Sequence, residues 1–180
     1  MKKVQTTLKD GTVVIGDLFD DVDFATFVTI FKAWLKINVL LQSLGGRGLN
    51  VPDVISEGLY CYYFNAIRTN GTAHSYDALD LITHEGIQVK STSIDSDVTS
   101  FGPMSTWDVL IFMDFAPTGV VDGTVDIYRI DEHPRDLILN KRKGETFVDQ
   151  QLQGRRPRFS IKGQIINPMG LKPIRTIKLV

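Results

Sequence analysis

Cysteine is almost absent from this chain of 180 residues, in which Cys61 is the single example. One thiol cannot form a disulfide within the chain, so we expect a reducing compartment. The first residues, MKKVQTTLKDG, contain no apolar segment of the kind that a secretory signal needs. The longest apolar stretch, residues 24–44, carries Lys32 and Lys36 near its middle, where a lipid-exposed helix tolerates charge poorly. These absences predict a soluble, cytoplasmic protein.

Other common signatures are also missing. The chain has no internal repeat, no low-complexity segment and no clear linker. His74 and His133 have no zinc-like spacing with Cys61, which argues against a zinc site. The glycine-rich stretch at 45–48 lacks the strand–loop–helix lysine pattern of a phosphate-binding loop. With 43 % hydrophobic and 23 % charged residues, we expect one globular domain over residues 1–180.

The net charge of −1 conceals a strong asymmetry. Residues 1–128 contain 8 Lys/Arg and 16 Asp/Glu, so 8 − 16 = −8. Residues 129–180 contain 12 Lys/Arg and 5 Asp/Glu, so 12 − 5 = +7. A basic C-terminal third attached to an acidic remainder indicates a polyanionic partner, although a solvated surface of ordinary lysines would give the same count.

The first half of the chain predicts a hairpin and two helices. Residues 3–16 are typical of two strands around a two-residue turn at Asp10-Gly11. A helix follows, with carboxylates at residues 20–23 favouring its start and glycines from Gly45 ending it. Residues 50–70 predict a second helix that stops at Asn70-Gly71, with an apolar stripe formed by Ile55, Leu59, Tyr62, Tyr63 and Ala66.

The second half is richer in strands. Residues 78–83 and 87–93 predict two strands around a turn at 84–86, and the apolar run 107–115 is typical of a central strand buried on both faces. We expect a further strand at 123–130, short helices at 134–139 and 145–154, and a strand at 156–166. The order of elements predicts an α/β (α+β) fold.

An unusual group of polar residues interrupts the two strands around residue 85. Gln88 and Lys90 share one face because side chains alternate along a strand. They need partners in a buried sheet, and Asp77 or Asp80 on the neighbouring strand can reach that face. Glu57 leans toward an apolar environment in the preceding helix and is a second candidate acid. Acids, an amide and a lysine at one sheet edge suit metal-assisted hydrolysis of a phosphodiester.

These residues resemble a known nuclease signature. Asp77, a turn and then Gln88-Val89-Lys90 look like the PD-(D/E)xK signature in its variant with glutamine in place of the second acid, and Tyr76 stands where proline often precedes the first acid. SEGLYCYYFNAI resembles the helix that supplies an extra acid. FGPMSTWDVLIFMDF and QGRRPRFSI resemble small type II restriction endonucleases of this superfamily. The resemblance covers most of residues 45–165.

The resemblance implies a restriction-endonuclease-like fold, with a mixed sheet of four to five strands flanked by helices, and Mg²⁺-dependent cleavage of double-stranded DNA. Asp77 is then a metal ligand, with Asp80 left open by spacing alone, and the backbone carbonyl of Val89 is another. Gln88 takes the place of the second acid, and Glu57 would restore the missing charge. Lys90 is the catalytic lysine.

The segment QQLQGRRPRFSIKG is the sharpest candidate for DNA contact. Arginine grips phosphates or pairs with guanine, and glutamine suits adenine. A basic surface strand without a ligand would have the same composition. The residues predicted to bind DNA are Gln151, Gln153, Arg155, Arg156 and Arg158 in this segment, together with Arg47, Ser91, Thr92 and Ser105.

The sequence therefore predicts a prokaryotic type II restriction endonuclease that cuts a short palindromic site. The likeness is greatest to members that cut GC-rich sites. Such an enzyme implies a homodimer, because a two-fold symmetric site matches a two-fold dimer, and a cognate DNA methyltransferase in the same system. A structure-specific repair or junction nuclease, a DNA-binding protein without catalysis, and a protein-interaction module remain as alternatives.

Overall fold

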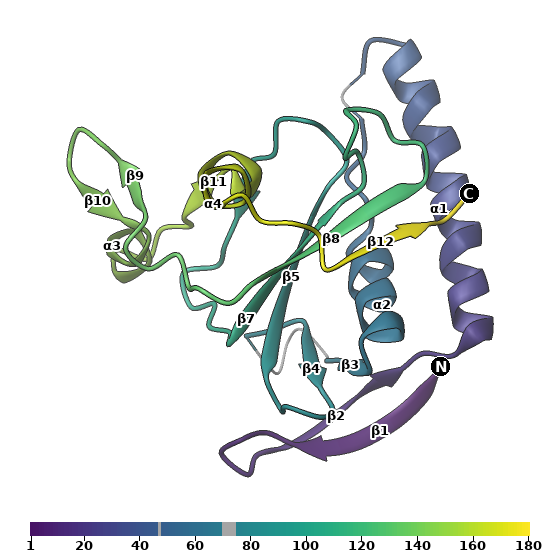
Figure 1. The fold of residues 1–180 in the computed structure, drawn as a ribbon, viewed down its shortest axis with the longest axis horizontal. Coiled ribbons are helices and arrows are strands. Elements are labelled where there is room, and N and C mark those ends of the chain that lie inside the picture. The colour runs from purple at the N-terminus through teal and green to yellow at the C-terminus, as the bar shows by residue number, and fades with distance from the viewer. Residues whose placement is uncertain (47, 70–74) are drawn as a thin grey trace.

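The computed structural model describes residues 1–46, 48–69 and 75–180, and in these residues eight strands form one mixed sheet (Figure 1). The strand order is β1-β2-β3-β4-β5-β7-β8-β12. The strands are β1 (Lys2–Thr7), β2 (Val13–Leu18), β3 (Ala66–Arg68), β4 (Ala78–Asp80), β5 (Gly86–Thr92), β6 (Thr99–Ser100), β7 (Val109–Asp114), β8 (Thr124–Ile130), β9 (Ile138–Asn140), β10 (Glu145–Thr146), β11 (Arg158–Phe159) and β12 (Arg175–Lys178). The helices are α1 (Asp21–Ser43), α2 (Asp53–Tyr63), α3 (Phe147–Leu152), the π-helical segment η1 (Lys162–Ile166) and α4 (Asn167–Met169).

Strand β7 lies at the centre of the fold, and all of its six residues are buried. It pairs in parallel with β5 and antiparallel with β8. Its alternating side chains divide the core in two. Ile111 and Met113 pack with α1 and α2, whereas Leu110 and Phe112 pack on the opposite face with apolar residues of the C-terminal third. The prediction of a central strand buried on both faces is confirmed.

Helix α1 begins as the acidic cluster predicts. The Asp20 carboxylate accepts hydrogen bonds from the backbone N–H groups of Val22 and Asp23, and the Asp23 carboxylate accepts one from the Asp20 backbone N–H. By length and composition α1 could cross a membrane, a test that core helices also pass. Phe27, Phe31 and Trp34 on its inner face are buried against the sheet and α2.

The sheet is larger than the predicted four to five strands. The N-terminal hairpin extends it at one edge through β2 and β3, and β12 extends it at the other by pairing with β8. Strands β3, β4 and β12 are only three or four residues long, too short for a periodic pattern to appear. The mixed α/β character is as predicted, and the strand number was wrong.

Helix α2 is shorter than predicted. It ends at Tyr63, and Asn65 then adopts a left-handed conformation with φ 51°, which asparagine tolerates better than most residues. Ala66 begins β3 instead of continuing the helical stripe. The predicted stop at Asn70-Gly71 lies outside the described residues.

Three further predictions of local structure were wrong. Residues 8–12 connect the two strands of the first hairpin, whereas a two-residue turn was predicted. Within this connection the Leu8 N–H donates to the Thr12 carbonyl. Residues 134–137 form a turn that leads into β9 and not a helix, because β9 pairs with β10. The strand expected at 156–166 stops at Phe159, where the distant Asp97 carboxylate accepts the backbone N–H groups of Ile161 and Lys162 and starts η1.

Candidate active site

Asp77 lies immediately before β4, with its carboxylate held by the neighbouring strand β5. Its backbone N–H donates to the Ile87 carbonyl at 2.9 Å. Its Oδ2 accepts hydrogen bonds from the Val89 backbone N–H at 2.8 Å and from the Gln88 side-chain amide. Of the two candidate acids, Asp77 is therefore the one beside Gln88 and Val89. Asp80 instead accepts the Ile82 and Thr83 N–H groups in the following turn.

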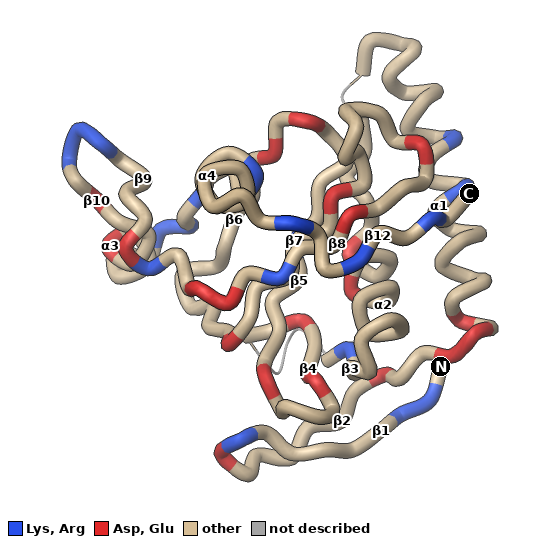
Figure 2. The backbone as a smooth tube through the Cα atoms, in the orientation of Figure 1, with Lys and Arg blue, Asp and Glu red and all other residues tan. Residues whose placement is uncertain are grey.

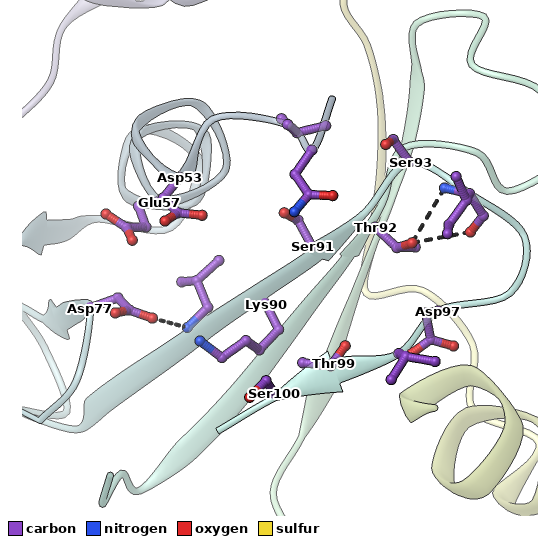
Figure 3. Close-up of a pocket in the computed structure, with 15 residues that line it drawn as sticks. Asp53, Glu57, Asp77, Lys90, Ser91, Thr92, Ser93, Asp97, Thr99 and Ser100 are labelled. Atoms are coloured by element: carbon purple, nitrogen blue, oxygen red, sulfur yellow. Dashed lines mark hydrogen bonds between the residues drawn. The ribbon is translucent and has the colours of Figure 1, made fainter. Parts of the chain in front are cut away.

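Gln88 and Lys90 lie on one face of β5, as strand alternation predicts. Gln88 is 3 % exposed and directs an amide N–H toward Asp77. An amide nitrogen cannot ligate a cation, so in this arrangement Gln88 orients Asp77. Lys90 extends toward Asp77 (Figure 3). Its Nζ also lies 5.7 Å from the centroid of the Phe101 ring.

Glu57 reaches the same place from α2. Its side chain is 13 % exposed, and its Oε2 lies 2.5 Å from the Nε of Arg68 in β3. Burial and the charge of Asp77 raise the pKa of Glu57 from 4.5 to about 7, despite the opposing effect of Arg68. Burial also raises the pKa of Asp77, with Lys90 opposing it. Both shifts arise first from burial, so each carboxyl group holds a proton more strongly than it would in water.

A cavity of about 310 Å³ brings these side chains together. Glu57, Asp77 and Lys90 line it, and Figure 3 shows the two acids on α2 turned toward Asp77 and Lys90. The second α2 acid is Asp53, which the sequence reasoning did not select. Its position one helical turn before Glu57 was the available signal, because residues four apart share a helix face. Ser91 and Thr92 also line this cavity, and the Thr92 hydroxyl donates to the Ile94 carbonyl.

The donor set suits a hard divalent cation. The described residues contain no cluster of three or more His, Cys, Asp or Glu side chains placed to hold a metal ion. Two partly buried carboxylates with raised pKa values nevertheless face one cavity, Glu57 and Asp77, and a cation between them would favour their ionised forms. Carboxylate and carbonyl oxygens are the ligands that Mg²⁺ and Ca²⁺ prefer.

A second cavity, of about 330 Å³, adjoins the first and shares Asp77 and Lys90 with it. Arg156 and Ser105 line it, together with Gln88. Arg156 is exposed and donates from Nε to the Ser100 hydroxyl at 3.2 Å. Among the residues predicted to bind DNA, Arg156 and Ser105 thus lie beside the catalytic candidates.

The other predicted DNA contacts of the C-terminal segment line neither cavity. Arg155 pairs with Glu145 at 2.7 Å, and Gln151 donates its amide to the carbonyls of the loop at 102–105. Gln153 and Arg158 are exposed, and Arg47 lies outside the described residues. Figure 2 shows Lys and Arg along the β9–β10 hairpin and β12, so the basic third spreads over several elements.

Comparison with known proteins identifies the family. The family model for the Bsp6I restriction endonuclease matches residues 19–168, which include all the catalytic candidates. The chain belongs to the Bsp6I restriction endonuclease family. The type II restriction enzyme Bsp6I of Bacillus sp. (strain RFL6) is 34 % identical over 166 residues, which are 89 % of this chain and 92 % of that relative. No solved structure matches the chain.

Membership of the Bsp6I family confirms the prediction of a site-specific endonuclease. The match runs from the residue before the α1 cap to Pro168 in α4, so β1, β2 and β12 lie outside it. The matched residues therefore include the central strands β5, β7 and β8, the helices α1 and α2, and the residues that line both cavities.

Proposed function

We propose that the chain is a PD-(D/E)xK nuclease in the glutamine variant, and that it hydrolyses phosphodiester bonds in double-stranded DNA at a short, GC-rich palindromic site. The family membership supports the restriction activity. The single observation that supports the catalytic assignment is the meeting of Glu57, Asp77 and Lys90 around one cavity.

Asp77, Glu57 and the Val89 backbone carbonyl would hold Mg²⁺. When bound, the ion supplies positive charge that stabilises the charge developing on the phosphoryl oxygens. Gln88 keeps the Asp77 carboxylate turned toward the cavity by donating an amide hydrogen bond to it. In this proposal Gln88 is a positioning residue, and Glu57 supplies the charge that an acid at position 88 would otherwise bring.

Lys90 acts on the attacking water and the phosphate. The water attacks phosphorus in line with the leaving oxygen and loses a proton to solvent. The bond from phosphorus to the leaving oxygen breaks as the new bond forms, and that oxygen takes up a proton from solvent. The ammonium group orients the water and adds positive charge next to the reacting phosphate. The basic third binds the DNA backbone, with Arg156 as the contact nearest to the cleavage site.

A palindromic site calls for a homodimer, in which each subunit cuts one strand. Helix α1 offers a surface for the second copy. Ile30, Ile37, Leu40 and Leu44 are 38–85 % exposed and follow the seven-residue repeat at which two helices pack along a seam. A cognate DNA methyltransferase and a cytoplasmic location complete the proposal, because an unmodified host chromosome would itself be a substrate.

Digestion of plasmid DNA tests this function. Incubation with Mg²⁺ should produce a defined set of fragments, and sequencing their ends should reveal one short symmetric site. EDTA should abolish the cutting. Cleavage restricted to branched or damaged DNA would replace the proposal by a junction or repair nuclease, and salt-sensitive binding without any cleavage would indicate a non-catalytic DNA-binding protein.

A further inference from the structure

The loop Gly102–Thr106, which connects β6 with β7, forms a wall of the second cavity. Its residues 102–105 face the same space as Asp77 and Lys90. A phosphate that reaches both of these residues brings the flanking nucleotides next to the loop. The loop is therefore placed to contact DNA immediately beside the bond that is cut.

Both ends of the loop are fixed. Phe101 is fully buried and stacks on Trp107, with 5.1 Å between the ring centroids. The Ser75 hydroxyl lies 2.7 Å from the Thr106 hydroxyl and 3.0 Å from the Thr106 carbonyl. A chain segment held at both ends in this way presents its middle in a defined position.

Gln151 holds the middle of the loop from α3. Its Nε2 donates to the Gly102 carbonyl at 3.1 Å and to the Ser105 carbonyl at 3.2 Å. These two bonds use both amide hydrogens of Gln151. The same amide cannot then donate a hydrogen bond to a base. We therefore expect Gln151 to hold the loop in position and not to contact bases itself.

The tip of the loop is Met104, whose side chain is 83 % exposed. Removing the exposed apolar surface of such a side chain from water is favourable in free energy. The cationic groups of Lys90 and Arg156 line the same cavity, so a nucleic acid is the polymer that their charge draws there. Sugars and base edges offer the apolar surface that a methionine can contact.

We propose that the loop Gly102–Thr106 contacts base pairs next to the cleavage point through Met104, and that Gln151 is its positioning residue. This inference rests on the proposed function, because it needs a DNA substrate with a preferred site. The proposal attributes sequence discrimination to the loop Gly102–Thr106, although its tip residue, Met104, has no polar side chain that could form hydrogen bonds with bases.

Two pairs of variants test it once the wild-type enzyme has been used to find the site. Met104→Ala removes the exposed contact, and Leu152→Ala is its control, since Leu152 is 82 % exposed on α3 and lines neither cavity. Gln151→Glu keeps the shape but sets a carboxylate against two carbonyls, and its control Gln5→Glu introduces the same charge on an exposed side chain of β1 that lines neither cavity.

Met104→Ala and Gln151→Glu should each weaken binding to the cognate duplex in Ca²⁺ by about tenfold, the scale of one lost base contact. Binding to a duplex with one changed base pair should stay within about twofold, so that the discrimination ratio falls. KM should rise more than kcat falls. The two controls should match the wild type.

Wild-type discrimination in both Met104→Ala and Gln151→Glu would overturn the role of the loop while leaving the restriction activity intact. A wild-type enzyme that cuts at no defined site would overturn the proposed function itself, and this inference with it. Met104→Ala changes only an exposed side chain, so the test does not depend on the folding of the Gln151 variant.

Discussion

Arg68 of β3 donates to Glu57 of α2 across 2.5 Å, beside the cavity that Glu57 and Asp77 line. The pair joins the helix to the sheet at the point where Asp77 also approaches. Burial and the charge of Asp77 outweigh the effect of the Arg68 guanidinium on the pKa of Glu57. Among the described residues, the cavity that Glu57 and Asp77 line has one ammonium group in its wall, that of Lys90, so a divalent cation would offset the remaining carboxylate charge.

Glu57 should make the stability of the protein depend on pH. Its pKa is about 7 in the folded protein, against 4.5 as the ordinary value, so folding takes up a proton between these pH values. The contribution of this proton to the free energy of unfolding is complete below pH 4.5. It falls by about 3 kcal/mol as the pH rises through 7. Glu57→Gln cannot titrate, so its Tm relative to the wild type should increase from pH 5 to pH 8 in EDTA.

Thermal melting at several pH values measures this difference. Glu132→Gln makes the same chemical change on an exposed side chain and should follow the wild type throughout. A constant Tm difference between Glu57→Gln and the wild type across this range would show that Glu57 is ionised in the folded protein at all of these pH values.

Gln88→Glu should destabilise the metal-free protein. The Gln88 amide now donates to Asp77, and a carboxylate in its place would repel Asp77 in a buried position. We expect a loss of about 1–3 kcal/mol in EDTA, with a recovery in Mg²⁺ because the added acid completes the cation site. Denaturant unfolding with and without Mg²⁺ checks this, and Gln153→Glu controls for charge. Equal stability of Gln88→Glu and wild type in EDTA would count against the observed Gln88–Asp77 contact.

Neighbouring arginines should differ in their effect on DNA binding. Arg156 lines the second cavity, whereas Arg155 is paired with Glu145 at 2.7 Å. Arg156→Ala should weaken binding uniformly across sequences and reduce the slope of log affinity against log salt by about 1. Arg155→Ala should have a smaller effect on both. Titration of labelled duplex at several salt concentrations distinguishes them, and an unchanged slope for Arg156→Ala would remove this residue from the interface.

The exposed apolar row of α1 should control the oligomeric state; it consists of Ile30, Ile37, Leu40 and Leu44. Ile37→Lys places a charge in the row of exposed apolar residues and should yield a monomer. Val39 is similarly exposed on a different face of the same helix, so Val39→Lys should leave a dimer intact. Sedimentation of both variants gives the masses. A dimeric Ile37→Lys variant would place the interface elsewhere, and a wild type that is monomeric with and without DNA would refute the dimer.

The catalytic candidates could be predicted because they depend on local geometry. Strand alternation puts Gln88 and Lys90 on one face, and a tight connection brings Asp77 to the adjacent strand. The long helix α1 and the buried strand β7 likewise follow from periodicity and caps. Family membership added the activity, which a short motif alone does not establish.

Other features depend on contacts between residues far apart in the chain, and no local pattern encodes them. Asp97 starts η1 with a carboxylate 64 residues away from the N–H group of Ile161. Gln151 donates a hydrogen bond to the Gly102 carbonyl, 49 residues away in the chain. The composition of its segment suggested DNA as its partner and gave no sign of this contact. No sequence pattern indicated the role of Arg68, because the helix predicted at residues 50–70 was expected to continue through this position.

The most direct measurement of the central claim compares cleavage and binding for Lys90→Ala on the same DNA. Lys90 lies beside Asp77 in both cavities, whereas Lys9 is in the loop of the β1–β2 hairpin and serves as the matched control. The account predicts that Lys90→Ala binds the cognate duplex in Ca²⁺ and does not cut it in Mg²⁺, while Lys9→Ala cuts as the wild type does. Normal cleavage by Lys90→Ala would contradict the catalytic assignment.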